Sequence, residues 1–180
     1  IREVELAIID KSHPDYDTVY AAPGSRLHAG RTLDDPNLPL HVEVVRYMPN
    51  SVLMSATGGG ADMANPATAG DGTELVAAEQ PVVTGAQADQ RIDTPSAYVR
   101  VYPRGGADAN DAVGTYLVST RLPGPGRPQV IEHDGATYHL FLRFKRTYLP
   151  YTLELIDFRH DRYIGTDKPK NFSSHLRLID

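Results

Sequence analysis

Hydrophobic and polar residues alternate with a period of two along most of this chain. Such alternation is the side-chain period of a β-strand that is buried on one face only. It predicts strands over residues 2–10, 39–47, 97–102, 114–121, 128–133, 136–146, 150–160 and 172–179. We find no stretch that combines the helical period with sufficient length. The pattern therefore predicts an all-β protein.

Turn residues separate these runs, since most of the 14 Pro and 15 Gly lie between them. Asp134-Gly135 suits a two-residue hairpin turn of type I′, which requires positive φ at both positions. The doubled Val44-Val45 predicts a β-bulge, and Leu149-Pro150 marks a corner. Residues 128–160 then predict a three-stranded meander. We expect an antiparallel β-sandwich or partly open barrel of roughly ten strands.

Residues 56–93 differ from the rest of the chain because they are small, polar and rich in Gly and Ala. A segment of this kind buries little apolar area, so ordering it would not repay its entropy cost. We predict a long flexible insertion loop here, within a single β-rich domain that spans residues 1–180.

The charge is unevenly distributed. The net charge of −5 argues against nucleic acid as the main partner. Residues 1–136 carry 10 Lys/Arg against 18 Asp/Glu, whereas residues 137–180 carry 8 against 5. The basic end could face an acidic partner, although a surface strand pair that happens to carry Arg and Lys explains it as well. The candidate basic patch consists of Arg143, Lys145, Arg146, Arg159, Arg162, Lys168 and Lys170.

The absence of Cys excludes disulfides, thiol redox chemistry and thiolate metal sites. No apolar run approaches the roughly 20 residues that span a bilayer. The first residue is Ile, and both ends lie in strand-like patterns. We therefore expect this chain to be a soluble piece of a larger protein.

No catalytic motif is recognisable, because GxSxG, HExxH, EF-hand and dinucleotide-binding patterns are all missing. The seven His are scattered, which is typical of solvated strand positions, and we assign no metal site. We therefore expect no enzyme activity from this chain alone. A hydrolase site assembled by the fold stays open as an alternative, since one sequence does not reveal such a site.

The stretch YIGTDKPKNFSS (163–174) connects two strand-like runs. Gly165 can adopt positive φ, and Asp167 and Asn171 can accept hydrogen bonds from nearby backbone amides. Pro169 restricts the backbone where the chain returns toward the second strand. These properties explain a long β-hairpin connection without assigning any catalytic role to its residues. If this stretch has a direct role, we expect docking rather than catalysis. The docking candidates are Phe158, Arg159, His160, Tyr163, Gly165, Thr166, Asp167, Pro169, Asn171, Phe172 and Ser174.

The same residues carry a family resemblance. Phe158, Arg159 and Tyr163 fit an F-R-x-x-x-Y-like run, and G-T-x-x-P-x-x-F-x-S begins at Gly165. This part of the chain resembles the extracytoplasmic domain of the ResB family, also called CcsB, the cytochrome c biogenesis factors of system II. The resemblance is good over residues 130–180, fainter over 1–55 and 94–121, and absent over 56–93.

The resemblance implies a parent protein anchored in the bacterial cell membrane, with this domain on the extracytoplasmic (periplasmic) face. The implied partners are a ResC/CcsA-like haem-handling membrane protein and apocytochrome c. The parent complex would attach haem to apocytochrome c, and this domain would act as a scaffold or docking domain. The resemblance implies no cofactor in this chain, because the haem path would lie in membrane segments.

An alternative that the sequence leaves open is a secreted β-sandwich that binds carbohydrate or protein. Six tyrosines could line a sugar-binding face, although tyrosines more often pack a sheet and leave their hydroxyl in water. They are Tyr98, Tyr102, Tyr138, Tyr148, Tyr151 and Tyr163.

Overall fold

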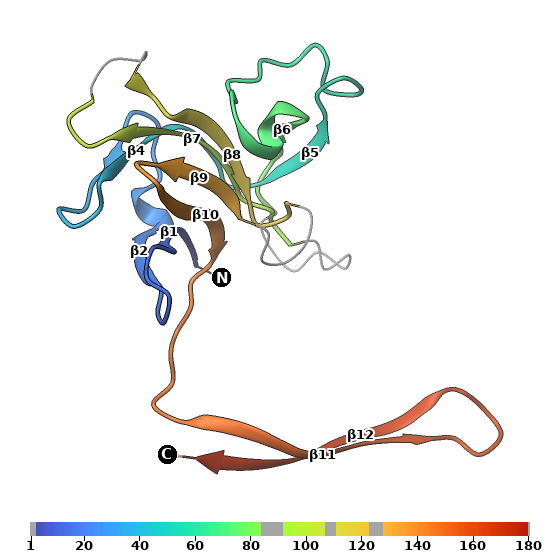
Figure 1. Ribbon diagram of the computed structural model, residues 1–180. Helices are drawn as coiled ribbons and strands as arrows, with labels where there is room; N and C mark the ends of the chain where they lie inside the picture. Colours follow the sequence, from blue (N-terminus) through green and yellow to red (C-terminus); the bar gives the residue numbers. More distant parts are fainter. Residues whose placement is uncertain (1–2, 84–91, 107–110, 123–127, 180) are drawn as a thin grey trace. The chain divides into compact units, whose positions relative to one another are not determined.

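The computed structural model describes residues 3–83, 92–106, 111–122 and 128–179. The chain divides into two compact units, Ile1–Lys145 and Arg146–Asp180 (Figure 1). This division differs from the single domain that the sequence predicts. The all-β prediction is confirmed: the described residues form four antiparallel sheets, no closed barrel, and helical structure only as short 3₁₀ turns. Two of these turns are η1 (Gly24–Arg26) and η2 (Gly70–Thr73).

Two four-stranded sheets form the larger part of the first unit. The first sheet has the order β2-β1-β10-β9, with strands β1 (Val4–Asp10), β2 (Thr18–Pro23), β9 (Gln129–His133) and β10 (Ala136–Phe144). The second has the order β3-β4-β7-β8, with strands β3 (Thr32–Leu33), β4 (Leu40–Met48), β7 (Ser96–Pro103) and β8 (Gly114–Ser119). Every neighbouring pair is antiparallel. The first and last strands of this unit, β1 and β10, pair directly with each other.

The main hydrophobic core joins these two sheets in the manner of a β-sandwich. Alternate residues of each strand point into it, as the period of two predicts. Its fully or almost fully buried members include Leu6, Ile8, Ile131 and Leu140 from the first sheet, and Leu40, Val42, Val99 and Val118 from the second.

A smaller core covers the other face of the second sheet. It contains Met48, Ala77, Tyr98 and Leu117. The hairpin of β5 (Ser51–Ser55) and β6 (Leu75–Glu79) supplies part of its cover. The Tyr98 hydroxyl accepts a hydrogen bond of 3.0 Å from the Ala77 amide. Burial raises the pKa of Tyr98 above its ordinary value of 10.0, so this phenol stays protonated at neutral pH.

The predicted loop over residues 56–93 is therefore wrong for part of its length. Strand β6 lies inside it and buries Val76 and Ala77. Gly72 is also buried, and it packs so closely that a Cβ there would lie only 2.8 Å from the Leu117 Cβ atom. Small residues permit this close approach of the backbone. The loop prediction considered only the apolar area of this segment, so it did not include the burial. Residues 84–91 of the predicted loop lie outside the described residues.

The hairpin turn and the β-bulge that the sequence predicts within the sandwich are both confirmed. Asp134 and Gly135 have φ of 50° and 76°, as a type I′ turn requires. The pairing of β4 with β7 shifts register between Val44 and Arg46, which is the predicted bulge. The three-stranded meander is correct only for β9 and β10. The third strand, β11 (Thr152–Arg162), pairs with β12 (Pro169–Ile179) instead.

Candidate functional site

Strands β11 and β12 form a two-stranded antiparallel hairpin, which Figure 1 shows as a long pair of arrows. Every residue of these two strands is exposed except Asp157, which is half-buried. Cross-strand partners in an antiparallel pair point to the same face. The register, with a bulge between Leu155 and Asp157, therefore assigns each side chain to one of two faces.

One face of this hairpin is apolar, and we call it the apolar face. It consists of Leu153, Leu155, Phe158 and His160 on β11, and of Phe172, Ser174, Leu176 and Leu178 on β12. The His160 ring stacks on the Phe172 ring with centroids 5.0 Å apart, and the centroids of the Phe158 and Phe172 rings are 6.2 Å apart. Leu155 is nevertheless 59% exposed and Phe172 60% exposed. These side chains form an apolar surface that no residue of the second unit covers fully.

The opposite face carries charges that pair with one another. Glu154 accepts a hydrogen bond of 2.9 Å from Arg177 across the strands. Asp157 accepts one of 2.7 Å from Arg159 on its own strand. The hairpin is therefore amphipathic, with an uncovered apolar side and a charged side whose cations have local partners.

The turn of the hairpin is held by its own backbone. The Thr166 amide donates to the Tyr163 carbonyl at 3.0 Å, and the Tyr163 amide donates to the Lys168 carbonyl at 3.2 Å. Arg162 donates to the Asp167 carboxylate at 2.7 Å. Gly165 has φ of 76°, the left-handed region that favours glycine. The turn thus has the hairpin geometry that the sequence predicts.

Replacing Gly165 by valine should loosen this hairpin. Nothing lies within 4 Å of a Cβ at position 165, so the cost is backbone strain at positive φ, roughly 1 kcal/mol or more. Hydrogen exchange of the β11 and β12 amides measures it, with faster exchange expected in the variant. Gly59→Val, at a glycine without positive φ, is the control. Unchanged hairpin protection in Gly165→Val would contradict this expectation.

The candidate docking residues come together on this hairpin in three groups. Phe158, His160, Phe172 and Ser174 belong to the apolar face. Arg159 and Asn171 lie on the charged face. Tyr163, Gly165, Thr166 and Asp167 form the turn, and Pro169 begins β12.

The candidate basic patch does not form one free cationic surface. Arg143 and Lys145 belong to the first unit, and the other five residues belong to the second. Arg143 pairs with Glu5 and Lys145 with Glu3, each at 2.8 Å. Arg159 and Arg162 pair within the hairpin, as described above. Local carboxylates thus neutralise four of the seven cations.

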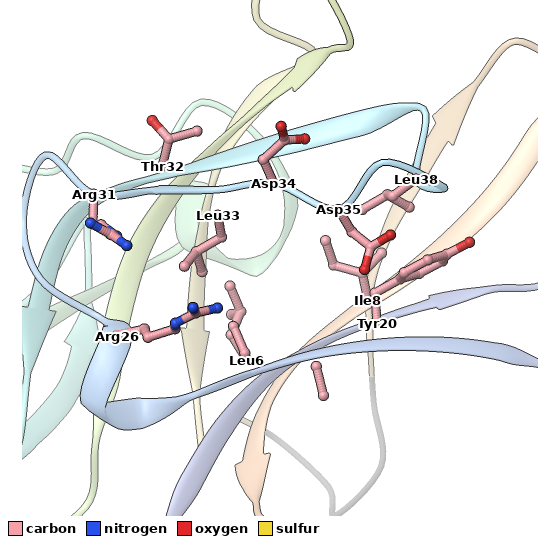
Figure 2. A pocket seen from close by; sticks show the side chains of 12 residues that line it. Leu6, Ile8, Tyr20, Arg26, Arg31, Thr32, Leu33, Asp34, Asp35 and Leu38 are labelled. Carbon is pink, nitrogen blue, oxygen red and sulfur yellow. The ribbon is translucent and has the colours of Figure 1, made fainter.

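A second candidate site, a pocket of about 260 Å³, lies between the first sheet and the segment that leads into β4. Figure 2 shows Arg26 and Arg31 on one side of it, with Asp34, Asp35 and Tyr20 on the other. Sequence reasoning missed this pocket. No local pattern reveals it, because its walls come from segments that only the fold brings together.

Other classes of site are not apparent in the described part of the chain. No described helix is long and apolar enough to cross a membrane. Residues 3–83, 92–106, 111–122 and 128–179 contain no cluster of three His, Cys, Asp or Glu side chains arranged for a metal ion. Of the six tyrosines considered for a sugar-binding face, three are buried: Tyr98, Tyr102 and Tyr138. Buried rings offer no face on which a sugar could stack.

Comparison with known proteins adds no assignment. No protein-family model matches this chain, and no curated protein matches it.

Proposed function

We propose that this chain is the extracytoplasmic docking domain of a ResB-like membrane protein that takes part in cytochrome c biogenesis. The hairpin β11–β12 is its docking element, and its occupant is an apolar surface of the ResC/CcsA-like partner protein. The single observation that carries this proposal is the uncovered apolar face of the hairpin.

An uncovered face of this kind has a physical cost. A two-stranded hairpin is marginally stable in water, and large exposed apolar patches commonly mark interaction sites. Each leucine or phenylalanine that becomes fully buried contributes about 1.5–3 kcal/mol. The six leucines and phenylalanines of the apolar face are each 48–60% exposed. A partner that covers them gains affinity and stabilises the hairpin at the same time.

The family resemblance supports the choice of partner. The motif residues Phe158, Phe172 and Ser174 belong to the apolar face, and Gly165 and Thr166 form the turn. In this proposal the motif preserves a docking surface rather than a set of reacting groups. The domain makes and breaks no bond. It positions the partner while haem is delivered and attached to apocytochrome c elsewhere in the complex.

The test places one charge on either face of the hairpin in the full-length parent. Leu176→Asp puts a carboxylate on the apolar face, whereas His175→Asp puts one on the neighbouring position of the charged face. We expect Leu176→Asp to lower recovery of the ResC/CcsA-like partner about tenfold, because the charge must lose water on docking. His175→Asp should retain the partner. Co-purification from membranes and the yield of haem-stained cytochrome c measure the effect.

Two results would overturn the proposal. The first is recovery of the partner at the parental level by Leu176→Asp. The second is a full-length parent without membrane-spanning segments, since such a protein would not be ResB-like.

A further inference from the structure

The pocket between the first sheet and the segment before β4 has a rigid frame on its cationic side. Arg26 ends η1, where Gly24 packs so closely on β1 that a Cβ would lie 2.6 Å from Val4 Cγ2. Arg31 follows a turn tied to β4, since the Gly30 amide donates to the Val44 carbonyl at 2.8 Å. The Val44 amide donates back to the Arg31 carbonyl at 2.9 Å. The backbone of both arginines is therefore fixed before any ligand arrives.

The opposite side is equally well fixed. The Arg104 side chain donates to the Leu38 carbonyl at 2.9 Å and to the Asp34 carboxylate at 2.9 Å. The Tyr20 hydroxyl donates to the Asn37 carbonyl at 3.2 Å. Burial, and then the charges of Asp10 and Asp35, raise the pKa of Tyr20, so it keeps its proton at neutral pH. The pocket is thus preformed, which lowers the ordering cost of binding.

The carboxylates that line the pocket have hydrogen-bond donors beside them, whereas the two guanidinium groups have no acceptor among the described residues. Asp34 is neutralised by Arg104, and Asp35 accepts a hydrogen bond of 3.0 Å from the Asn37 amide. Among the described residues, neither Arg26 nor Arg31 has an ion pair or a side-chain hydrogen bond. Figure 2 shows their guanidinium groups on the same side of the pocket. This side of the pocket is therefore free to bind an anion.

Between the two sides lies an apolar lining. Leu6 and Ile8 of β1 are buried members of the main core and also line the pocket. Leu33 and Leu38 complete this lining from the segment before β4. This lining accommodates a ligand that carries an anionic group at one end and a small apolar body behind it.

We propose that this pocket binds small organic carboxylates with an apolar body, whose carboxylate is held by Arg26 and Arg31. Guanidinium groups suit this role because their planar donors match the two oxygens of a carboxylate. The apolar body packs on the half-buried Leu33, beside the edges of Leu6 and Ile8 that line the pocket. This site is independent of the docking hairpin and of the function proposed for it.

Hexanoate is the probe, titrated into the ¹⁵N-labelled chain and followed by amide chemical shifts. We expect saturable shifts at Ala22, Thr32 and Leu33, which line the pocket. The double variant Arg26→Gln/Arg31→Gln should raise the dissociation constant about tenfold, because two exposed charge-assisted contacts are lost. Hexanamide, which has the same body without the charge, should bind the parental chain about tenfold more weakly.

Controls make the result specific. Arg121→Gln removes an exposed cation away from the pocket lining and should leave hexanoate binding unchanged. The melting temperature of the double variant should match that of the parental chain, because both arginines are exposed. Three results would overturn the proposal: no saturable shifts, shifts confined to hairpin amides, or equal affinity for hexanoate and hexanamide.

Discussion

Replacement of Leu140 by alanine is expected to lower the free energy of unfolding of the sandwich by about 2–5 kcal/mol. Leu140 is 1% exposed and lies at the centre of β10, opposite Ile8 of β1. The substitution removes buried carbon atoms and leaves a cavity that rigid neighbouring strands fill only in part. Urea unfolding followed by circular dichroism measures the loss, which corresponds to roughly 10 °C in melting temperature.

Leu178→Ala in the hairpin is the matched control for this experiment. Leu178 is 56% exposed, so its truncation in the isolated chain should change the free energy of unfolding by no more than about 0.5 kcal/mol. If both variants lost a similar free energy of unfolding, Leu178 would be buried and the apolar face would be covered. A small loss in Leu178→Ala would agree with side chains that await a partner.

Glu5→Ala is expected to have the second large effect, about 3 kcal/mol or more in the free energy of unfolding. The Glu5 carboxylate accepts a hydrogen bond of 2.8 Å from Arg143, and the two side chains are only 11% and 13% exposed. Without Glu5, the guanidinium stays largely buried with its main counter-charge removed. The cost is therefore mostly that of an unpaired charge in a poorly hydrated place.

Two further variants separate this effect from the loss of a contact. Adding Arg143→Ala to Glu5→Ala should recover part of the stability, because it removes the unpaired charge. Glu3→Ala removes the neighbouring pair with Lys145, also 2.8 Å long, in which the Glu3 side chain is 69% exposed. Water screens that pair, so its loss should matter much less. Equal losses in Glu3→Ala and Glu5→Ala would show that burial does not control the strength of these pairs.

The fold class and several turns could be predicted from the sequence because local chemistry determines them. Strand alternation depends on neighbouring residues, and the turn at Asp134 and Gly135 depends on the φ that those two residues tolerate. The bulge after Val44 is similarly local. The hairpin turn around Gly165 could be predicted from its own residues for the same reason.

Pairing and burial between distant segments could not be predicted in this way. Gly60 leaves room for the buried Val76 of β6, and Gly72 leaves room for Leu117 of β8, whereas composition alone suggested a loop. The pairing partner of β11 depends on where the chain turns after β10. Whether an apolar residue such as Leu176 is covered depends on other parts of the fold and on partners.

The candidate sites show the same division. The docking residues of the hairpin, such as Phe158 and Phe172, adjoin one another through a local turn, so the sequence could suggest them together. The pocket joins Arg26 and Arg31 to Tyr20 and Asp35 through the packing of β1 and β2 beside the segment before β4. No spacing along the chain records that arrangement.

The self-paired charges of the hairpin have a consequence for ionic strength. Because Glu154 pairs with Arg177, and Asp157 with Arg159, that face presents little unpaired charge to attract an acidic or basic partner. Added salt weakens complexes held by exposed ion pairs, whereas salts such as sulfate strengthen apolar burial. A complex formed through the apolar face should therefore survive a high-salt wash that would dissociate an ionic one.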